Sequence, residues 1–336
     1  MKRLVQNDYL TIFDRLLDSE VIDIKEIAIW ALGNIISVAE NLESFLSTNI
    51  LSKIFSFANT DNKSLIRVLA TFFKNLAVPD AKLDDYTLYN IIDIFSNYIY
   101  RIENDIISDS LWGLANISDM EVDMKKFTPL IDRIVSIDYT KMDKGDVIAM
   151  LLIIGNISAG VDKTVLENLY KDDIYEYLEA MLFNLNDNKI KIKILWVTSN
   201  VCYNSNKMIE KLLESNFSNQ VIKLIDSPLP NVRKEALYVV SNIVDGKHFS
   251  HSLKLVAKGL YTELISIMNN ICDKAILKQV LFILENIFSS AEVFRDFSDS
   301  NPLVKKFEDI GGVDCLEKLH NHYCHDIYKQ SERILN

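Results

Sequence analysis

A tryptophan followed four residues later by an asparagine recurs along this sequence. The pairs are Trp30 and Asn34, Trp112 and Asn116, Trp196 and Asn200, and, with tyrosine in place of tryptophan, Tyr238 and Asn242. An asparagine amide both donates and accepts hydrogen bonds, so it can pair with the main chain of an extended peptide. An indole face accepts the methylene stem of lysine or arginine while its quadrupole attracts the cation. The pairs therefore indicate binding of an extended basic peptide.

Several carboxylates lie close to these pairs in the sequence, among them Asp109, Glu235 and Asp162. Asp109 comes one helical turn before Trp112, Glu235 comes one turn before Tyr238, and Asp162 follows the weaker copy that ends in Asn156. Carboxylates beside aromatic rings favour cations. A charge on a helix surface is as often only a solvated face, and that alternative stays open for each of the three.

The spacing of the asparagines predicts the elements that position them. Weaker copies of the motif end in Asn75, Asn156 and Asn286, and the seven asparagines are 41, 41, 40, 44, 42 and 44 residues apart. A period of about 40–47 residues with helical patterning is typical of armadillo and HEAT repeats, which stack into one continuous core. We expect one all-α, right-handed superhelical armadillo-repeat solenoid over residues 1–336. Its partial first repeat covers about residues 1–17, and its last repeats cover about 270–336.

A helical wheel separates the motif side chains from the core. At about 100° per residue, one stripe contains Ala28, Ala31, Leu32 and Ile35. Trp30 and Asn34 fall together on the opposite face. An unpaired buried asparagine costs about 1–3 kcal/mol, so the asparagines are expected to form an exposed row.

Composition narrows the class of partner. With 9 Gly and 5 Pro in 336 residues, the chain has few turn residues, which favours helices joined by tight connections. The formal net charge of −11 argues against nucleic acid, because phosphates would be repelled. It favours a basic partner whose binding weakens as salt rises.

Cysteine usage and hydropathy give no sign of secretion or membrane insertion. The four cysteines contain no CxxC pair and are expected to be reduced. The start of the chain lacks an apolar signal core, and the longest apolar stretch, 147–154, is too short to span a bilayer.

One cluster leaves a metal site open as an alternative. His320, His322, Cys324 and His325 fall within six residues and could ligate zinc, although a surface helix and turn is the simpler explanation. Motifs of nucleotide sites and hydrolases are absent. We therefore expect no enzyme activity, no cofactor and no metal.

The ordered set of motifs resembles the importin α family of nuclear import adaptors. Segment 25–35 resembles the second armadillo repeat of that family, 155–162 the fifth, 233–242 the seventh, 285–287 the eighth, and 308–329 the last repeats. The resemblance covers nearly the whole chain in order.

The resemblance implies two binding sites for Lys/Arg-rich nuclear localisation signals, with the peptide antiparallel to the repeats. The implied major site consists of Trp30, Asn34, Asn75, Asp109, Trp112 and Asn116. The implied minor site consists of Asp162, Trp196, Asn200, Glu235, Tyr238, Asn242 and Asn286. Implied partners are cargo proteins, importin β and an export receptor, with shuttling between cytoplasm and nucleus and no membrane insertion.

The chain departs from the family pattern at several places. Thr71 stands where the family has tryptophan, and Lys193 stands where an acidic residue is common. The basic importin-β-binding segment of the family is not in this sequence, so we expect binding surfaces without competition from such a segment. The nearest alternative is a general armadillo scaffold that binds another extended peptide, although such scaffolds typically have basic grooves.

Overall fold

The computed structural model describes residues 8–37, 39–78, 81–170, 174–292 and 301–335, and every regular element in these ranges is a helix. The predicted all-α class is confirmed. Contacts divide the chain into two compact units, residues 1–160 and 161–336. The expectation of one solenoid over 1–336, with a partial repeat at 1–17, stays a prediction.

Unit 1 consists of α-helices and short 3-10 helices. These are α1 (Asp8–Leu17), α2 (Ile22–Ile36), α3 (Ala39–Leu46), α4 (Ile50–Ser56), α5 (Lys63–Leu76), α6 (Asp85–Tyr98), α7 (Asn104–Ser118), η1 (Met124–Lys126), η2 (Thr128–Leu130), α8 (Ile131–Ser136), η3 (Tyr139–Lys141) and α9 (Lys144–Gly160).

In the described ranges, the regular elements of unit 2 are all α-helices. They are α10 (Lys163–Leu169), α11 (Ile174–Asn184), α12 (Asn188–Asn204), α13 (Asn206–Glu214), α14 (Phe217–Leu224), α15 (Pro230–Asp245), α16 (Phe249–Ala257), α17 (Leu260–Asn270), α18 (Lys274–Ser290), α19 (Pro302–Glu308), α20 (Gly312–Leu319) and α21 (His325–Leu335).

Short polar side chains fix where several helices begin. Asn62 accepts a hydrogen bond from the Leu65 amide at the start of α5, and Asp84 accepts one from the Thr87 amide at the start of α6. Asp273 does the same for α18. Each satisfies an amide that the first helical turn leaves without a partner.

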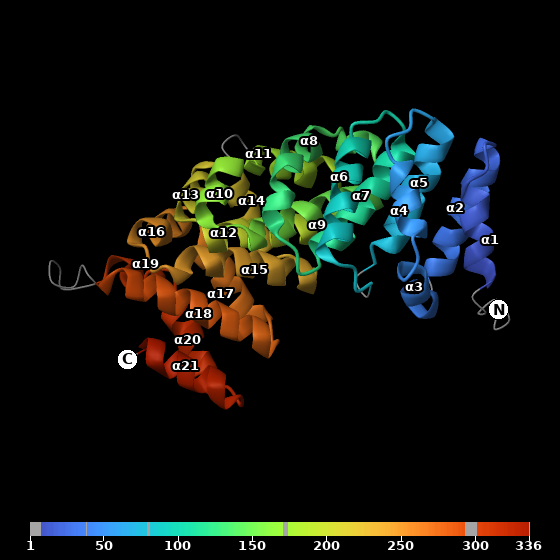
Figure 1. Ribbon diagram of the computed structural model, residues 1–336. Helices are drawn as coiled ribbons and strands as arrows, with labels where there is room; N and C mark the ends of the chain where they lie inside the picture. Colours follow the sequence, from blue (N-terminus) through green and yellow to red (C-terminus); the bar gives the residue numbers. More distant parts are fainter. Residues whose placement is uncertain (1–7, 38, 79–80, 171–173, 293–300, 336) are drawn as a thin grey trace. The chain divides into compact units, whose positions relative to one another are not determined.

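The seven asparagines of the repeat lie on seven different helices, here called the motif helices: α2, α5, α7, α9, α12, α15 and α18. Within unit 1, α2, α5, α7 and α9 pack against one another in that order (Figure 1). Within unit 2, α12 packs on α15 and α15 packs on α18, which in turn contacts α21. The chain thus places successive motifs on neighbouring helices within each unit.

Hydrogen bonds between neighbouring motif helices keep the register of the repeat. Ser108 on α7 donates to Asp146 on α9 at 2.6 Å, and the Asn156 amide donates to Ser118 at 2.9 Å. Both bonds join residues that are 38 apart in the sequence. The repeat period therefore has a direct structural counterpart in polar contacts as well as in the core.

The core face of α2 differs slightly from the predicted stripe. Buried residues are Ala28, Ile29, Leu32, Gly33 and Ile36, whereas the predicted core residues Ala31 and Ile35 are only partly buried. The reason is the position of α5. Gly33 packs on α5 in ordinary van der Waals contact, since a Cβ there would be 3.5 Å from the Cα of Phe72. The packed face is therefore turned toward α5.

Aromatic side chains contribute to the cores of both units. In unit 1, Phe72 is 1% exposed and meets Phe45 and Phe73 edge to face. In unit 2, Tyr261 meets Phe307 edge to face, and its hydroxyl donates to the Leu303 carbonyl at 3.0 Å. No helix in the described ranges is long and apolar enough to cross a membrane.

Candidate peptide-binding surface

The two tryptophans of unit 1 lie outside the core, as predicted. Trp30 on α2 is 59% exposed, and Trp112 on α7 is partly exposed. Trp112 lies against the start of α9, where a Cβ on Gly145 would be 3.7 Å from the indole ring. A partly exposed indole face is suited to receive the stem of a lysine or arginine.

Between these two tryptophans, α5 presents a polar cluster instead of a third ring. Thr71 Oγ1 donates to Asp109 Oδ2 at 2.5 Å, and the Lys74 ammonium pairs with Asp109 Oδ1. Phe72 points into the core and does not replace the missing indole. Asp109, predicted to attract a ligand cation, therefore already has two partners within the chain.

The asparagines of unit 1 are held in different ways. Asn34 is exposed, and Asn116 is partly exposed. The Asn75 amide lies 3.5 Å from the Gly33 carbonyl, and the Asn156 amide donates to Ser118. In these two hydrogen bonds the side-chain NH₂ group of Asn75 or Asn156 is the donor. The amide oxygens are not used in them and can accept hydrogen bonds.

In unit 2, two aromatic rings of the motif are each covered by a lysine. Trp196 on α12 is partly exposed, and Lys193 Nζ lies 4.8 Å from the centre of its ring. Tyr238 on α15 is 38% exposed, and Lys234 Nζ lies 5.6 Å from its ring centre. Both distances are within the range of cation–π attraction.

A hollow of about 220 Å³ lies beside Tyr238, between α15 and the start of α18. Its lining includes Lys234, Tyr238, Asp273 and Gln279. Gln279 also donates to the Ser241 hydroxyl, which joins α18 to α15. The hollow has the size of a pocket for a single side chain.

Glu235 lies half-buried on α15, close to the same lysines. Burial raises the pKa of its carboxyl, and the positive charges of Lys234 and Lys193 act in the opposite direction. A carboxylate in this setting gains from a nearby cation, because the cation compensates for lost hydration.

The asparagines of unit 2 do not all match the predicted exposed row. Asn200 is partly exposed. The Asn242 amide donates to both the carbonyl and the hydroxyl of Ser199, each at 2.9 Å. Asn286 corrects the prediction, because it is 5% exposed and its amide donates to the Phe282 carbonyl of its own helix at 2.9 Å. That hydrogen bond removes the cost of burial that made an exposed position expected.

Asp162, assigned by resemblance to the minor site, has a local structural role. Its carboxylate accepts a hydrogen bond from the Val165 amide at 3.0 Å and caps α10. The side chain is exposed, so a contact with a ligand stays a prediction.

The contacts of Lys74 and Lys234 are not apparent from the sequence pattern, and that of Lys193 is apparent only in part. The sequence showed Lys193 only as an unfavourable charge, and the structure shows it over the Trp196 ring. Lys74 lies 35 residues before its partner Asp109, so no local pattern links them.

Two histidine side chains of the histidine-rich segment near the end of the chain pack against tyrosine rings. His322 stacks on Tyr323 with ring centres 4.5 Å apart, and His320 lies 4.8 Å from Tyr328. Within the residues that the structure describes, no group of three or more His, Cys, Asp or Glu side chains is arranged to hold a metal ion.

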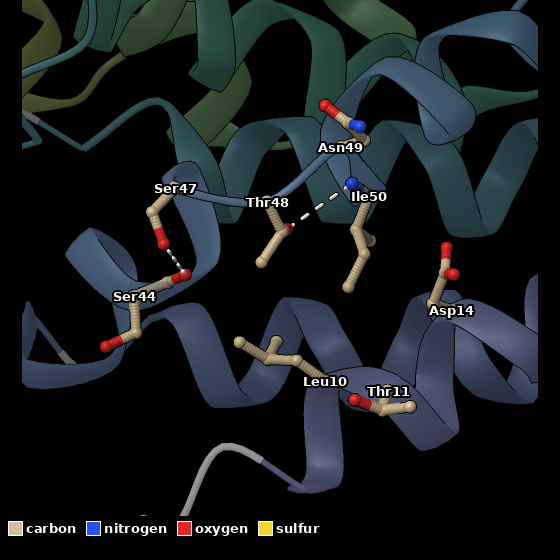
Figure 2. A pocket seen from close by; sticks show the side chains of 8 residues that line it. All are labelled: Leu10, Thr11, Asp14, Ser44, Ser47, Thr48, Asn49 and Ile50. Atoms are coloured by element: carbon tan, nitrogen blue, oxygen red, sulfur yellow. Dashed lines mark hydrogen bonds between the residues drawn. The ribbon is translucent and has the colours of Figure 1, made fainter.

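Another hollow, of about 390 Å³, lies in unit 1 between α1 and the α3–α4 connection (Figure 2). Figure 2 shows Leu10, Thr11 and Asp14 of α1 facing Thr48 and Ile50. Asp14 is the only ionisable residue among those lining it, and it pairs with Lys53 at 2.7 Å. None of the motif residues lines this hollow.

The class of protein defined by these stacked helices is the armadillo repeat. A family model described as an atypical Arm repeat matches residues 301–336. An engineered protein solved by crystallography has a TM-score of 0.76 over 98% of this chain and 78% of its own, at 17% identity. A designed armadillo repeat protein in complex with the peptide (KR)4 has a TM-score of 0.60 over 72% of this chain and 98% of its own, at 19% identity. The predicted armadillo fold is confirmed.

Within that class, the chain is importin-α-like. It is 22% identical to importin subunit alpha-8 of Arabidopsis thaliana over 99% of this chain and 75% of that protein. It is 23% identical to importin subunit alpha-5 of the same plant, covering 93% of this chain and 61% of that protein. Importin subunit alpha-1 of Caenorhabditis elegans is 21% identical over 82% of this chain and 51% of its own length. The chain thus spans about half to three quarters of the length of these relatives.

Proposed function

We propose that the chain is a nuclear import adaptor that binds Lys/Arg-rich nuclear localisation signals. The observation that supports this best is the set of aromatic rings four residues before the asparagines, which stay exposed or partly exposed on the motif helices: Trp30, Trp112, Trp196 and Tyr238. Rings left at the surface beside amides match an extended ligand with long cationic side chains.

The two units correspond to the two proposed sites. The major site lies in unit 1, on α2, α5 and α7, and the minor site lies in unit 2, mainly on α12 and α15. The buried Asn286 of α18 is not part of it. In both, asparagines align the peptide backbone and aromatic rings select lysine or arginine. Asp109 and Glu235 add negative charge, as does the net charge of −11.

The comparisons support this proposal in two respects. The relatives are named importin α subunits, and one protein of the same fold was solved with a peptide of alternating lysine and arginine. By the same likeness we propose cargo proteins, importin β and an export receptor as partners, and shuttling between cytoplasm and nucleus.

A fluorescence anisotropy titration tests the proposal. A labelled peptide with a lysine-rich cluster is expected to bind with a dissociation constant in the micromolar range or below, which corresponds to about 8 kcal/mol or more. A peptide of equal length with glutamate at each lysine is the control. Equal binding of both peptides would refute selection of a basic signal and would favour a general armadillo scaffold.

A further inference from the structure

Three lysines of the chain lie where the cation of a bound peptide is proposed to lie. Lys74 pairs with the Asp109 carboxylate, Lys193 covers the Trp196 ring, and Lys234 covers the Tyr238 ring. All three are on motif helices, and none belongs to the sites inferred from the sequence.

The arrangement in unit 1 is compact. The side chains of Lys74 and Asp109 are 30% and 19% exposed, so the pair is partly shielded from water. The Thr71 hydroxyl donates a hydrogen bond to the other oxygen of the same carboxylate. Both Asp109 oxygens thus already have a partner, so a ligand cation would compete with Lys74 for the charge of this carboxylate.

The arrangement in unit 2 uses rings instead of an ion pair. Lys193 on α12 lies over Trp196. Burial raises the pKa of the Glu235 carboxyl on α15, the helix that packs against α12, and the positive charge of Lys193 acts in the opposite direction. Lys193 therefore combines an aromatic face with a nearby carboxylate, which is the environment proposed for a lysine of the peptide. On α15, the next motif helix, Lys234 lies over the Tyr238 ring in the same way, and both residues line the hollow beside that ring.

We propose that Lys74, Lys193 and Lys234 are resident competitors that a basic peptide must displace, and that they set the affinity of both sites. This inference depends on the proposed function, because it concerns the same ligand. Displacement exchanges one cation for another at each position, so the peptide gains only the difference between the two. The released lysine side chain returns to water, where its ammonium is well hydrated.

The expected effect per position follows from the strength of the contacts. A cation–π contact at an exposed ring corresponds to a change in affinity of about two- to five-fold. Removing Lys193 or Lys234 should therefore tighten binding by about that factor. Removing Lys74, which makes an ion pair instead, should have an effect of similar size, because surface ion pairs correspond to a change of about 1.4- to 5-fold. Effects at positions that do not touch should combine nearly multiplicatively.

The test uses Lys74→Met, Lys193→Met, Lys234→Met and the triple variant, titrated with the lysine-rich peptide. Methionine keeps much of the apolar stem and removes the charge. The matched control is Lys126→Met, because Lys126 covers the Tyr89 ring at 4.9 Å and neither residue lies on a motif helix. Every single variant lowers the net charge by the same amount, so general electrostatic attraction changes equally.

Tighter binding of the three motif variants than of Lys126→Met would support the inference. Binding by the unaltered protein with all single variants equal to the control would overturn it and leave the proposed function intact. Absence of binding by the unaltered protein and by the triple variant alike would refute the proposed function and the inference with it. Binding by the triple variant alone would support the inference and contradict the proposed function of the unaltered chain.

Proton NMR of the protein without peptide gives a readout that needs no ligand. If Lys193 covers the indole, its ε-methylene protons should be shifted upfield by the ring current, and Trp196→Ala should abolish the shift. Unshifted ε-methylene protons in the unaltered protein would show that Lys193 does not lie over the Trp196 ring, and would overturn the inference for this residue.

Discussion

The indole of Trp112 and that of Trp196 are equivalent in sequence but have different neighbours. Trp112 lies near the Asp109 cluster and against Gly145, whereas Trp196 is covered by Lys193. The major site also lacks an indole at Thr71, and the minor site has an added positive charge at Lys193. Two defects of similar size should narrow the difference in affinity between the sites.

We therefore predict similar losses of affinity from Trp112→Ala and Trp196→Ala when each is titrated with a peptide that has a single basic cluster. Trp112→Ala loses a cation–π face worth about 0.5–1 kcal/mol and some burial of the lysine stem. Trp196→Ala loses at most the same amount, because Lys193 then has no ring to cover. Trp112→Phe and Trp196→Phe serve as controls that keep an aromatic face. A loss confined to Trp112→Ala would show that the major site dominates despite Thr71.

Restoring the missing ring provides a separate prediction. Thr71→Trp should tighten binding in unit 1 several-fold, because it adds a face for a lysine stem and releases one oxygen of Asp109 from the Thr71 hydroxyl. Thr71→Val, which removes the hydroxyl without adding a ring, separates the two contributions. If Thr71→Trp bound the peptide no better than Thr71→Val, the added ring would have no role in binding.

The raised pKa of Glu235 predicts how stability and peptide binding change with pH. Burial raises the pKa of its carboxyl, so Glu235 takes up a proton at a higher pH than an exposed glutamate does. Burial of the charged carboxylate lowers the free energy of unfolding. This destabilisation is present above the pKa of the folded state and disappears as the pH falls through that value, because the carboxyl becomes neutral. For binding, protonation removes a negative charge from the proposed minor site.

We expect affinity for the basic peptide to fall as the pH is lowered from 7 toward 5, with part of the fall absent in Glu235→Gln. The comparison is made in Trp112→Ala protein, so that unit 2 dominates the signal. Identical pH profiles with and without the glutamate would show that Glu235 does not contribute to the site.

At the scale of the helix, two glycines in equivalent motifs have opposite surroundings. Gly113 on α7 faces Phe95 of α6, and a Cβ there would overlap the phenyl ring. Gly33 on α2 has room, since the nearest atoms to an added Cβ lie 3.5 Å away on Phe72. Only Gly113 is required for close packing of helices.

We predict that Gly113→Ala lowers the free energy of unfolding by about 1–3 kcal/mol, because Phe95 is fully buried and must shift. Gly33→Ala should be neutral or stabilising by up to about 1 kcal/mol, because alanine is the better helix former. Urea denaturation followed by circular dichroism compares the two. Equal destabilisation by both would contradict the described contact between α6 and α7.

The helices also show how much of the fold could be read from the sequence and where such reading stopped. The spacing of 40 to 44 residues between asparagines predicted the motif helices, because packing on a neighbour of the same kind repeats with the sequence. The core face of α2 was placed slightly wrongly, since the position of α5 against Gly33 depends on contacts 40 residues away. Asn286 was expected at the surface, but a bond to its own Phe282 carbonyl permits burial.

The same limit applies to the candidate surface. Trp30, Trp112, Trp196 and Tyr238 were recognisable because each stands four residues before an asparagine. Lys74 and Lys234 were not, because their significance depends on partners that only folding or side-chain orientation reveals.

At the scale of the whole molecule, the net charge of −11 should affect every basic ligand. Attraction between exposed charges falls as salt shortens the Debye length from about 10 Å at 0.1 M to about 3 Å at 1 M. We predict weaker binding of the lysine-rich peptide at high salt, with aromatic contacts leaving a residual affinity. An affinity independent of salt would contradict a role for the acidic charge.

Because the chain contains 3 Trp, indole NMR tests the central claim directly. In ¹⁵N-labelled protein, the three indole signals report Trp30 and Trp112 in unit 1 and Trp196 in unit 2. Titration with a peptide that has two lysine-rich clusters should shift all three in a saturable manner, and the glutamate version should shift none. Saturable binding of the lysine-rich peptide that leaves all three indole signals unchanged would contradict a binding surface built on these rings.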